Sequence, residues 1–257
     1  MTLSQTLAQK INYLEMNKKV LIFISLSIVA FVFPFRAFCN DNPWVSEKTY
    51  IKNYFGDGAL MEEGWVLDYE KTGFWKFYHE NGQLESEGFF EGGELNDCWK
   101  EYNEEGKLIV DGCFILGKRE GYWKSYYPNG NFMNEGLYVD DEKQGWWKEY
   151  CDAEKLMSVG KYEDGKREGY WEMYYLNGNI RTSGEYSNDT KFDWWKEYDQ
   201  EGNLFAEGYY YNDLRDGFWI HYENEVRDCC GMYEKGARKY TWKFFNEEGK
   251  LSQVYEF

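Results

Sequence analysis

The sequence is poor in the residues that catalytic and metal sites use most. Histidine occurs twice in 257 residues, at His79 and His221, and neither has a cysteine or serine arranged around it as a partner. No phosphate-binding loop, nucleophile elbow or calcium-loop pattern is present. The carboxylates are scattered through turns, which is typical of a solvated face. We therefore expect a protein that is not an enzyme, with no catalytic residues, no metal site and no cofactor.

The sequence also lacks an apolar run long enough to span a bilayer. Its uncharged, mainly apolar stretch, residues 20–33, is shorter than the roughly 18 to 20 residues that a spanning helix needs. Two lysines precede the stretch, and Ala37 and Cys39 supply the small residues that a signal peptidase requires. This pattern predicts a signal peptide over residues 1–39, cleaved before Asn40, and an exported protein. An uncleaved membrane anchor and a lipid-anchored Cys39 stay open as alternatives.

Basic charge is scarce. Lysine and arginine number 29 against 46 acidic residues, a net charge of −17, and removing residues 1–39 takes away a further net +3 and leaves about −20. Such a surface repels nucleic acid and anionic lipid and suits a basic partner protein. We expect a protein partner, no nucleic acid, and no stable membrane insertion after cleavage. The alternative is that the charge merely keeps an aromatic-rich sheet soluble.

Cysteine gives no framework. The six cysteines recur at no fixed spacing and match no metal motif, so the sequence predicts no particular disulfide pairs.

Aromatic residues, in contrast, are abundant, at 21% of the chain, and they are periodic. Tryptophan recurs at a spacing of 24 six times and then 23, with an aromatic residue three positions later. A glycine follows at position 13 after the tryptophan and another aromatic at position 15. The predicted repeat-core residues are Trp75, Trp99, Trp123, Trp147, Trp171, Trp195, Trp219 and Trp242, with Tyr78, Tyr102, Tyr126, Tyr150, Tyr174, Tyr198 and Tyr222.

Each 24-residue unit has the pattern of a β-hairpin. A short aromatic run is followed by a turn such as Asn81-Gly82, in which we expect both residues to adopt positive φ, and a second run leads to a turn such as Asp164-Gly165. One hairpin cannot bury its own aromatic face, so neighbouring units must pack together. The sequence predicts an all-β, elongated antiparallel meander of stacked hairpins. Its expected divisions are a degenerate N-terminal capping repeat over residues 40–72 and tandem repeats with a C-terminal cap over residues 73–257.

A second period of 48 residues overlies the first. The heptapeptide GKREGYW occurs at 117–123 and at 165–171, while the intervening units carry Trp-Lys-Glu-Tyr, beginning at Trp99, Trp147 and Trp195. Odd and even units should therefore have different surroundings.

The recurring pattern Gly-x-Trp-Lys-x-Tyr, turn glycine, apolar residue, Gly-x-Tyr resembles the variant MORN repeats of YwqK-like antitoxins. Residues 121–130 match it closely, and the resemblance covers about residues 50–257. It implies a bacterial protein, an antiparallel hairpin array and, in some members, neutralisation of a partner toxin. This sequence departs from the pattern at Glu154 in place of a turn glycine, at Tyr240 in place of the glycine before Trp242, and in one unit that is a residue short.

Two surface features are candidate binding sites, and a third is a candidate for ion pairing. The acidic turn Asp140, Asp141 and Glu142 is a candidate site for a protein partner, for example a toxin. Lysines one position after the tryptophans are followed directly by Glu101, Glu149 and Glu197, which predicts cross-strand ion pairing with neighbouring units. Sets such as Trp123, Tyr126 and Tyr127, or Trp171, Tyr174 and Tyr175, offer the alternative of a cell-surface attachment module that binds polysaccharide or choline-like groups. Solvent-facing aromatic pairs would support that alternative, and buried ones would not.

Overall fold

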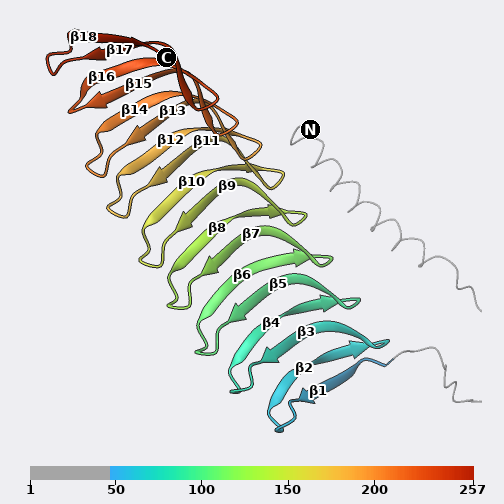
Figure 1. Cartoon of the computed structure of the whole chain (residues 1–257). Coiled ribbons are helices and arrows are strands. Elements are labelled where there is room, and N and C mark those ends of the chain that lie inside the picture. Colours follow the sequence, from blue (N-terminus) through green and yellow to red (C-terminus); the bar gives the residue numbers. More distant parts are fainter. Residues whose placement is uncertain (1–46) are drawn as a thin grey trace, which may run out of the picture. The chain divides into compact units, whose positions relative to one another are not determined.

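The computed structural model describes residues 47–257, and these residues form 18 β-strands and no helix (Figure 1). The strands are β1 (Thr49–Tyr54), β2 (Leu60–Leu67), β3 (Glu70–Tyr78), β4 (Leu84–Glu91), β5 (Glu94–Tyr102), β6 (Leu108–Ile115), β7 (Lys118–Tyr126), β8 (Phe132–Val139), β9 (Glu142–Tyr150), β10 (Leu156–Glu163), β11 (Lys166–Tyr174), β12 (Ile180–Ser187), β13 (Thr190–Tyr198), β14 (Leu204–Tyr211), β15 (Leu214–Glu223), β16 (Val226–Glu234), β17 (Ala237–Phe245) and β18 (Leu251–Glu256). Over this range, then, no helix long and apolar enough to cross a membrane occurs. The predicted signal peptide and its cleavage site lie outside the described residues.

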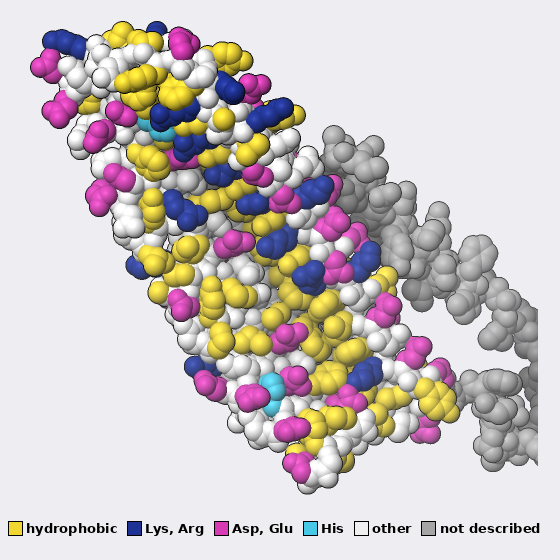
Figure 2. Space-filling model, viewed as in Figure 1, with side chains coloured by type: hydrophobic (Ala, Val, Ile, Leu, Met, Phe, Trp, Pro, Cys, Tyr) yellow, Lys and Arg dark blue, Asp and Glu magenta, His cyan; other side chains and the backbone are white. Residues whose placement is uncertain are grey.

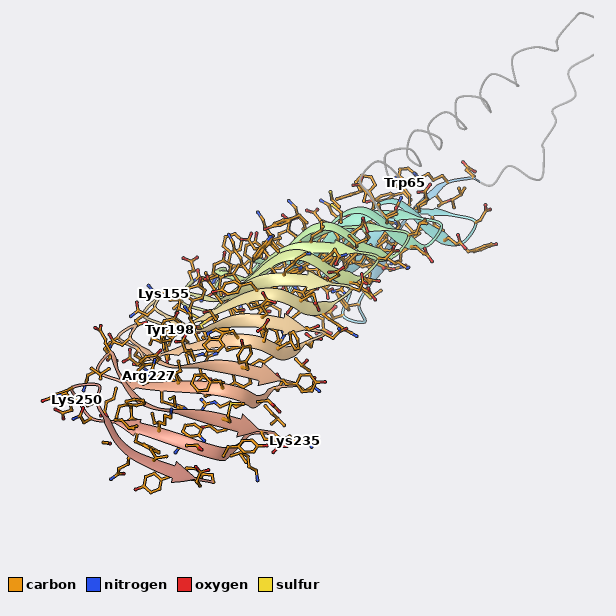
Figure 3. All side chains as sticks on the ribbon, turned by 90° about the horizontal axis from the view of Figure 1, so that it is seen from above. Trp65, Lys155, Tyr198, Arg227, Lys235 and Lys250 are labelled. Atoms are coloured by element: carbon orange, nitrogen blue, oxygen red, sulfur yellow. The ribbon has the colours of Figure 1, made fainter. Side chains whose placement is uncertain are left out.

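The strands form one open antiparallel sheet. Each strand pairs with the next one in the chain, from β1 to β18, which is a simple meander. Side chains project from both faces, and the sheet twists along its length (Figure 3). Lys155 and Lys250 mark the edge that carries the longer loops, and Lys235 marks the opposite edge. The predicted stacked-hairpin fold is confirmed.

The two edges use different turns, and the expected geometry of the Asn-Gly turn was wrong. In the loop after β3, Gly82 has a φ of 83° but Asn81 does not adopt positive φ. The amide of Gly82 bonds the carbonyl of His79, and the amide of His79 bonds the carbonyl of Gln83, so the loop has three residues rather than two. Two residues of positive φ occur instead at the opposite edge, as at Asp164 and Gly165.

The unit that is one residue short also has a structural explanation. Strands β15 and β16 are joined by a two-residue turn, Asn224 and Glu225, both with positive φ. The equivalent position in the other tryptophan units holds the three-residue loop. The sheet therefore absorbs the deletion in a loop and keeps the register of Trp219 opposite Gly231.

The tryptophans at the 24-residue spacing lie on one face of the sheet, and all eight are buried. Seven of the eight indole Nε1 atoms donate to the carbonyl oxygen ten residues earlier, as Trp171 does to Lys161 at 3.1 Å. Each ring lies against the glycine directly opposite on the preceding strand. A Cβ added at Gly160 would lie 2.1 Å from the Trp171 ring, which explains the periodic glycine.

A second set of rings alternates with the tryptophans and closes the core. From Trp75 to Phe257, successive rings meet edge to face with centroids 5.0–6.4 Å apart and interplanar angles of 69–89°. The intervening members are Phe90, Phe114, Tyr138, Tyr162, Tyr186, Tyr210 and Tyr233. We call this continuous set, with the eight tryptophans and Phe257, the aromatic spine. It stands in place of a globular core.

Candidate functional site

A row of basic side chains covers the aromatic spine. In seven of the eight units, the residue four positions before the tryptophan is Lys or Arg, and its charged group lies 4.0–4.3 Å from the centroid of a spine ring. These residues are Lys71, Arg119, Lys143, Arg167, Lys191, Arg215 and Arg238. Sequence reasoning missed this row, although its 24-residue spacing was visible. Lys143 and Lys191 are half-buried against the spine, and this burial lowers the pKa of each.

Counted from the unit of Trp75, the second, fourth and sixth units add an acid to this face. Glu101, Glu149 and Glu197 follow their tryptophans by two positions, where the odd units carry Phe, Ser, Met or His. The Glu197 side chain is buried, accepts a 2.8 Å bond from the Tyr210 hydroxyl and pairs with Arg215 at 2.7 Å. The structure therefore shows the 48-residue alternation as a difference in how the spine is covered.

On the opposite face, lysines and acids alternate across the strands. Glu87 lies directly between Lys76 and Lys100, and Asp111 and Glu135 are flanked by lysines in the same way. At the equivalent place near the N-terminal end, Lys52 and Glu63 form a 2.9 Å ion pair. This register is the one that cross-strand ion pairing requires.

The tyrosines three positions after the tryptophans join this charged ladder. The Tyr78 hydroxyl donates to Glu63 at 2.7 Å, and Tyr102, Tyr150 and Tyr222 donate to acids in the same manner. Burial and the bond to the acid raise the pKa of Tyr78 to about 12. These tyrosines thus serve the sheet as hydrogen-bond donors at any ordinary pH.

Beside the charged ladder runs a row of exposed cross-strand pairs, which we call the outer pairs. In seven of the pairs one member directly precedes a tryptophan of the spine and the other lies opposite it on the neighbouring strand, and Tyr50 with Trp65 forms the equivalent pair of the first hairpin. The pairs are Tyr50–Trp65, Phe74–Phe89, Cys98–Cys113, Tyr122–Leu137, Trp146–Lys161, Tyr170–Glu185, Trp194–Tyr209 and Phe218–Met232. Most of their rings are exposed. Figure 2 shows the other face of the sheet, where the basic row lies and hydrophobic side chains form a band with Lys and Arg side chains among them.

The predicted acidic turn lies between β8 and β9 and is already bonded to its neighbour. The Asp141 carboxylate accepts bonds of 2.9 Å from both the backbone N–H and the Nε of Arg119, and these bonds lower the pKa of Asp141. Asp140 pairs with Lys118 at 3.1 Å, while Glu142 is exposed at the start of β9. Asp140 and Asp141 therefore join adjacent turns, in addition to any role in partner binding.

The Trp-Tyr-Tyr sets do not form solvent-facing aromatic boxes. Trp123 and Trp171 are buried in the spine. The Tyr127 hydroxyl donates to the carbonyl of Tyr150 at 2.9 Å, and the corresponding tyrosine two units later makes the same bond. These phenols join the loops of odd units to those of even units.

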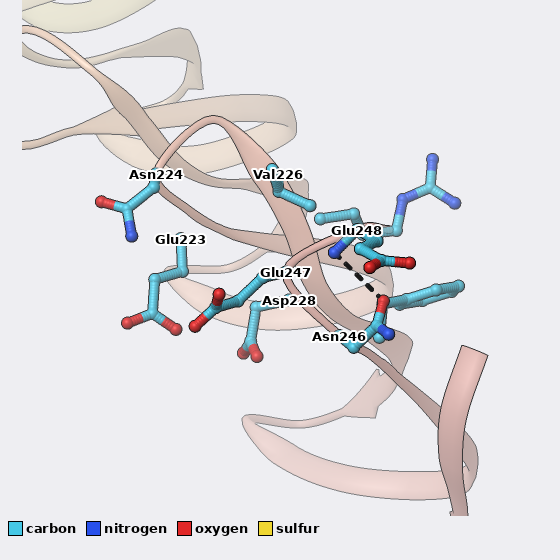
Figure 4. Close-up of a pocket in the computed structure, with 9 residues that line it drawn as sticks. Glu223, Asn224, Val226, Asp228, Asn246, Glu247 and Glu248 are labelled. Atoms are coloured by element: carbon cyan, nitrogen blue, oxygen red, sulfur yellow. Dashed lines mark hydrogen bonds between the residues drawn. The ribbon is translucent and has the colours of Figure 1, made fainter. Parts of the chain in front are cut away.

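The short unit leaves an open hollow of about 630 Å³ near the C-terminal end (Figure 4). It lies between the two-residue turn after β15 and the loop after β17, where Asn246 Oδ1 accepts a 3.1 Å bond from the backbone N–H of Glu248. Several acids, with Arg227 and Phe245, line it. The two histidines lie elsewhere: His79 Nε2 is 2.9 Å from the carbonyl oxygen of Tyr102, and His221 is half-buried against the spine.

Of three comparisons with known proteins, the one with family models agrees with the repeats. A comparison with curated proteins finds no match. Among solved structures, the chain is similar to the crystal structures of TcdB2-TccC3-TEV and TcdB2-TccC3-Cdc42, with 14% and 13% identity and a TM-score of 0.22 for each. The matches cover 80% of this chain but 12% of those chains. The family model described as "MORN repeat variant" matches residues 71–91, 119–140 and 167–188, which are hairpins of the odd units. The chain therefore carries variant MORN repeats at these three positions.

Proposed function

We propose that this protein is a non-enzymatic repeat protein that binds a protein partner, and that the outer pairs form the contact surface. The observation that carries the proposal is the row of exposed aromatic side chains repeated along one face. Tryptophan, tyrosine and phenylalanine are enriched at protein interfaces because they bury large area with little conformational entropy. A row of such pairs on successive hairpins offers a long, regular surface of the kind that repeat proteins use.

The charge of the molecule defines the expected partner. The lysine–acid ladder beside the outer pairs is balanced, whereas the whole chain carries −17. A basic protein with an apolar strip therefore complements both features, and the acidic turn including Glu142 would steer its approach. We extend the proposal to neutralisation of a toxin, in the manner of a YwqK-like antitoxin or immunity protein, on the strength of the variant MORN repeats.

The positions of the histidines support a binding role. His221 packs between Trp219 and Trp242 at centroid distances of 6.1 and 6.0 Å, and His79 contacts the carbonyl oxygen of Tyr102 in the neighbouring loop. Both side chains thus contribute to the packing of the array.

We also propose that the protein is exported. N-terminal sequencing of the protein from fractionated cells would test this, and a full-length chain in the cytosol would contradict it.

The contact surface is tested with two variants of equal exposure. Trp146, in the outer pairs, and Leu176, in a loop at the edge, are each 63% exposed. With the full-length chain as bait, Trp146→Ala should weaken capture of the partner at least tenfold, and Leu176→Ala should not. Because charge steers the approach, the association rate should also fall between about 50 mM and 500 mM salt.

Three results would count against the proposal. Equal effects of the two substitutions would show that the outer pairs are not the contact surface. Tight binding to a polysaccharide or to choline, competed by free ligand and insensitive to salt, would favour the attachment module instead. Turnover of a substrate by the purified protein would contradict the non-enzymatic assignment.

A further inference from the structure

One of the outer pairs consists of two cysteines. Cys98 on β5 and Cys113 on β6 lie directly opposite each other, and their sulfur atoms are 3.0 Å apart. Cys98 is exposed and Cys113 is half-buried, so a reagent in solution can reach the pair. In the preceding unit the same position holds a pair of rings, Phe74 and Phe89, at a centroid distance of 5.1 Å. The two cysteine side chains are smaller than two rings, so the contact area between them is much smaller.

The geometry suits a covalent bond between the two sulfurs. Directly opposed residues of an antiparallel pair have Cα atoms roughly 4.5 or 5.5 Å apart, and disulfides join Cα atoms roughly 4.4–6.8 Å apart. The register therefore needs no backbone movement to close the bond. We propose that Cys98 and Cys113 form a cross-strand disulfide that joins β5 to β6.

The unit that contains this pair is the one in which the tryptophan is held differently. Leu95 occupies the position at which the other seven units place a Lys or Arg over the spine. The Trp99 indole donates to Glu101 at 2.8 Å rather than to a backbone carbonyl of the preceding strand. Asp97 has a φ of 85° where most units have glycine. A bond between β5 and β6 would stabilise the place where the repeat departs most from its pattern.

The reaction is a thiol–disulfide exchange, and its oxidant is a disulfide donor, either a small molecule or a protein. The Cys113 thiolate attacks the donor, forms a mixed disulfide and releases one donor thiolate. The Cys98 thiolate then attacks the Cys113 sulfur and releases the second donor thiolate. The two protons lost by the cysteines pass to the two donor thiolates through solvent, and the donor gains the two electrons.

The reaction is pH-dependent because the thiolate, and not the thiol, attacks. In the reduced pair, the hydrogen bond between the sulfurs is the chief cause that raises the pKa of Cys98 to about 12. Once Cys113 is joined to the donor, its sulfur bears no proton and no negative charge, so this influence on Cys98 is relieved. Closure should therefore accelerate as pH rises.

The test uses the full-length reduced protein and oxidised glutathione. After acid quenching and alkylation under denaturing conditions, peptide mapping should find Cys98 linked to Cys113 and four of the six cysteines alkylated. Cys98→Ser or Cys113→Ser should abolish the link. Cys151→Ser, in the loop after β9, is the control and should preserve it.

A second readout follows the effect of the bond on the sheet. For a closed loop of about 15 residues, chain entropy alone can slow local opening on the order of a hundredfold. Backbone amides of β5 and β6 should therefore exchange more slowly in the oxidised protein, and those of β17 should not change.

The proposal is overturned if Cys98 and Cys113 end as separate glutathione adducts or pair with other cysteines. It is also overturned by a metal site, since Asp97, Cys98 and Cys113 offer ligand atoms within 4.8 Å of one another. Stoichiometric zinc in the purified protein, with oxidation only after chelation, would show that the thiols hold a metal instead.

Discussion

At the scale of the residue, the periodic glycines are required by the indoles that lie on them. Gly160 has a φ that any residue can adopt. Glycine is therefore required at this position because a side chain would not fit, and not because of the backbone conformation. Because a Cβ there would lie 2.1 Å from the Trp171 ring, Gly160→Ala must displace a buried ring. We expect a loss of about 1–3 kcal/mol in the free energy of unfolding, measured by urea denaturation.

The matched control is Gly56→Ala, because no heavy atom lies within 4 Å of the Cβ it would add. This substitution should leave the unfolding midpoint almost unchanged. If both alanines destabilise equally, steric contact with the indole is not the reason for the glycine.

His221 is a half-buried group whose titration should affect stability. Burial, with nearby Arg215 and Arg238, lowers its pKa from 6.5, and among the described residues its Nε2 has no hydrogen-bond partner. Because the folded pKa is below the unfolded one, unfolding takes up a proton as pH falls below about 6.5, and stability is lost there. His221→Phe should remove this loss and stabilise the protein by about 1–2 kcal/mol, since phenylalanine occupies the position in other units.

Thermal midpoints measured from pH 5 to pH 8 (about the range in which histidine titrates) would check this prediction. His79→Asn is the control, because Asn103 occupies the corresponding place one unit later. That variant should keep the pH dependence of the wild type. A pH dependence that survives in the His221→Phe variant would assign it to other groups.

At the scale of the element, the loops show what local sequence can and cannot specify. The Asn-Gly pair predicted the position of the loop after β3 correctly, but it predicted the wrong loop length. Glycine is favoured both in a two-residue turn and at the last position of a three-residue loop, so the pair does not distinguish the two. Glu154 occupies that last place after β9 with a φ of 58°, where equivalent loops have glycine, as at Gly82 and Gly130. The sequence revealed the substitution, and the structure shows the backbone strain that accompanies it.

Glu154→Gly should therefore stabilise the protein, by about 0.5–1 kcal/mol once the extra flexibility of glycine in the unfolded chain is included. Asp152→Gly, in the same loop but without positive φ, should instead destabilise it slightly. Urea midpoints of the two variants separate the effect of φ from the removal of a negative charge.

The surfaces of the elements were harder to predict than their existence. The tryptophan spacing specified the strands because one residue type recurs at one position. The outer pairs escaped notice because their members change from unit to unit, from Phe74 to Cys98 to Tyr122, and most of them share only their exposure, which the sequence does not show. The basic row over the spine was visible as a 24-residue period. Its role became clear only when the sheet placed each charge over a ring.

At the scale of the whole molecule, each unit contacts only its neighbours along the sheet. Every strand from β1 to β18 pairs with the adjacent strands alone, and the spine rings also meet in sequence. Stability should therefore be a sum of local and nearest-neighbour contributions, and opening should begin at the ends. The β18 side chains are all exposed, which fits an end that frays first.

Two tryptophan truncations distinguish this behaviour from that of a single globular core. Trp147 packs between Tyr138 and Tyr162 in the middle of the spine, whereas Trp242 is the last tryptophan and meets Tyr233 and Phe257. Each alanine should cost about 3–5 kcal/mol locally. In hydrogen exchange, Trp147→Ala should expose strands on both sides of β9, and Trp242→Ala only the last hairpin. Uniform loss of protection across all strands in both variants would mean that the array unfolds as one cooperative unit, because only long-range coupling could carry a defect at β17 to β3.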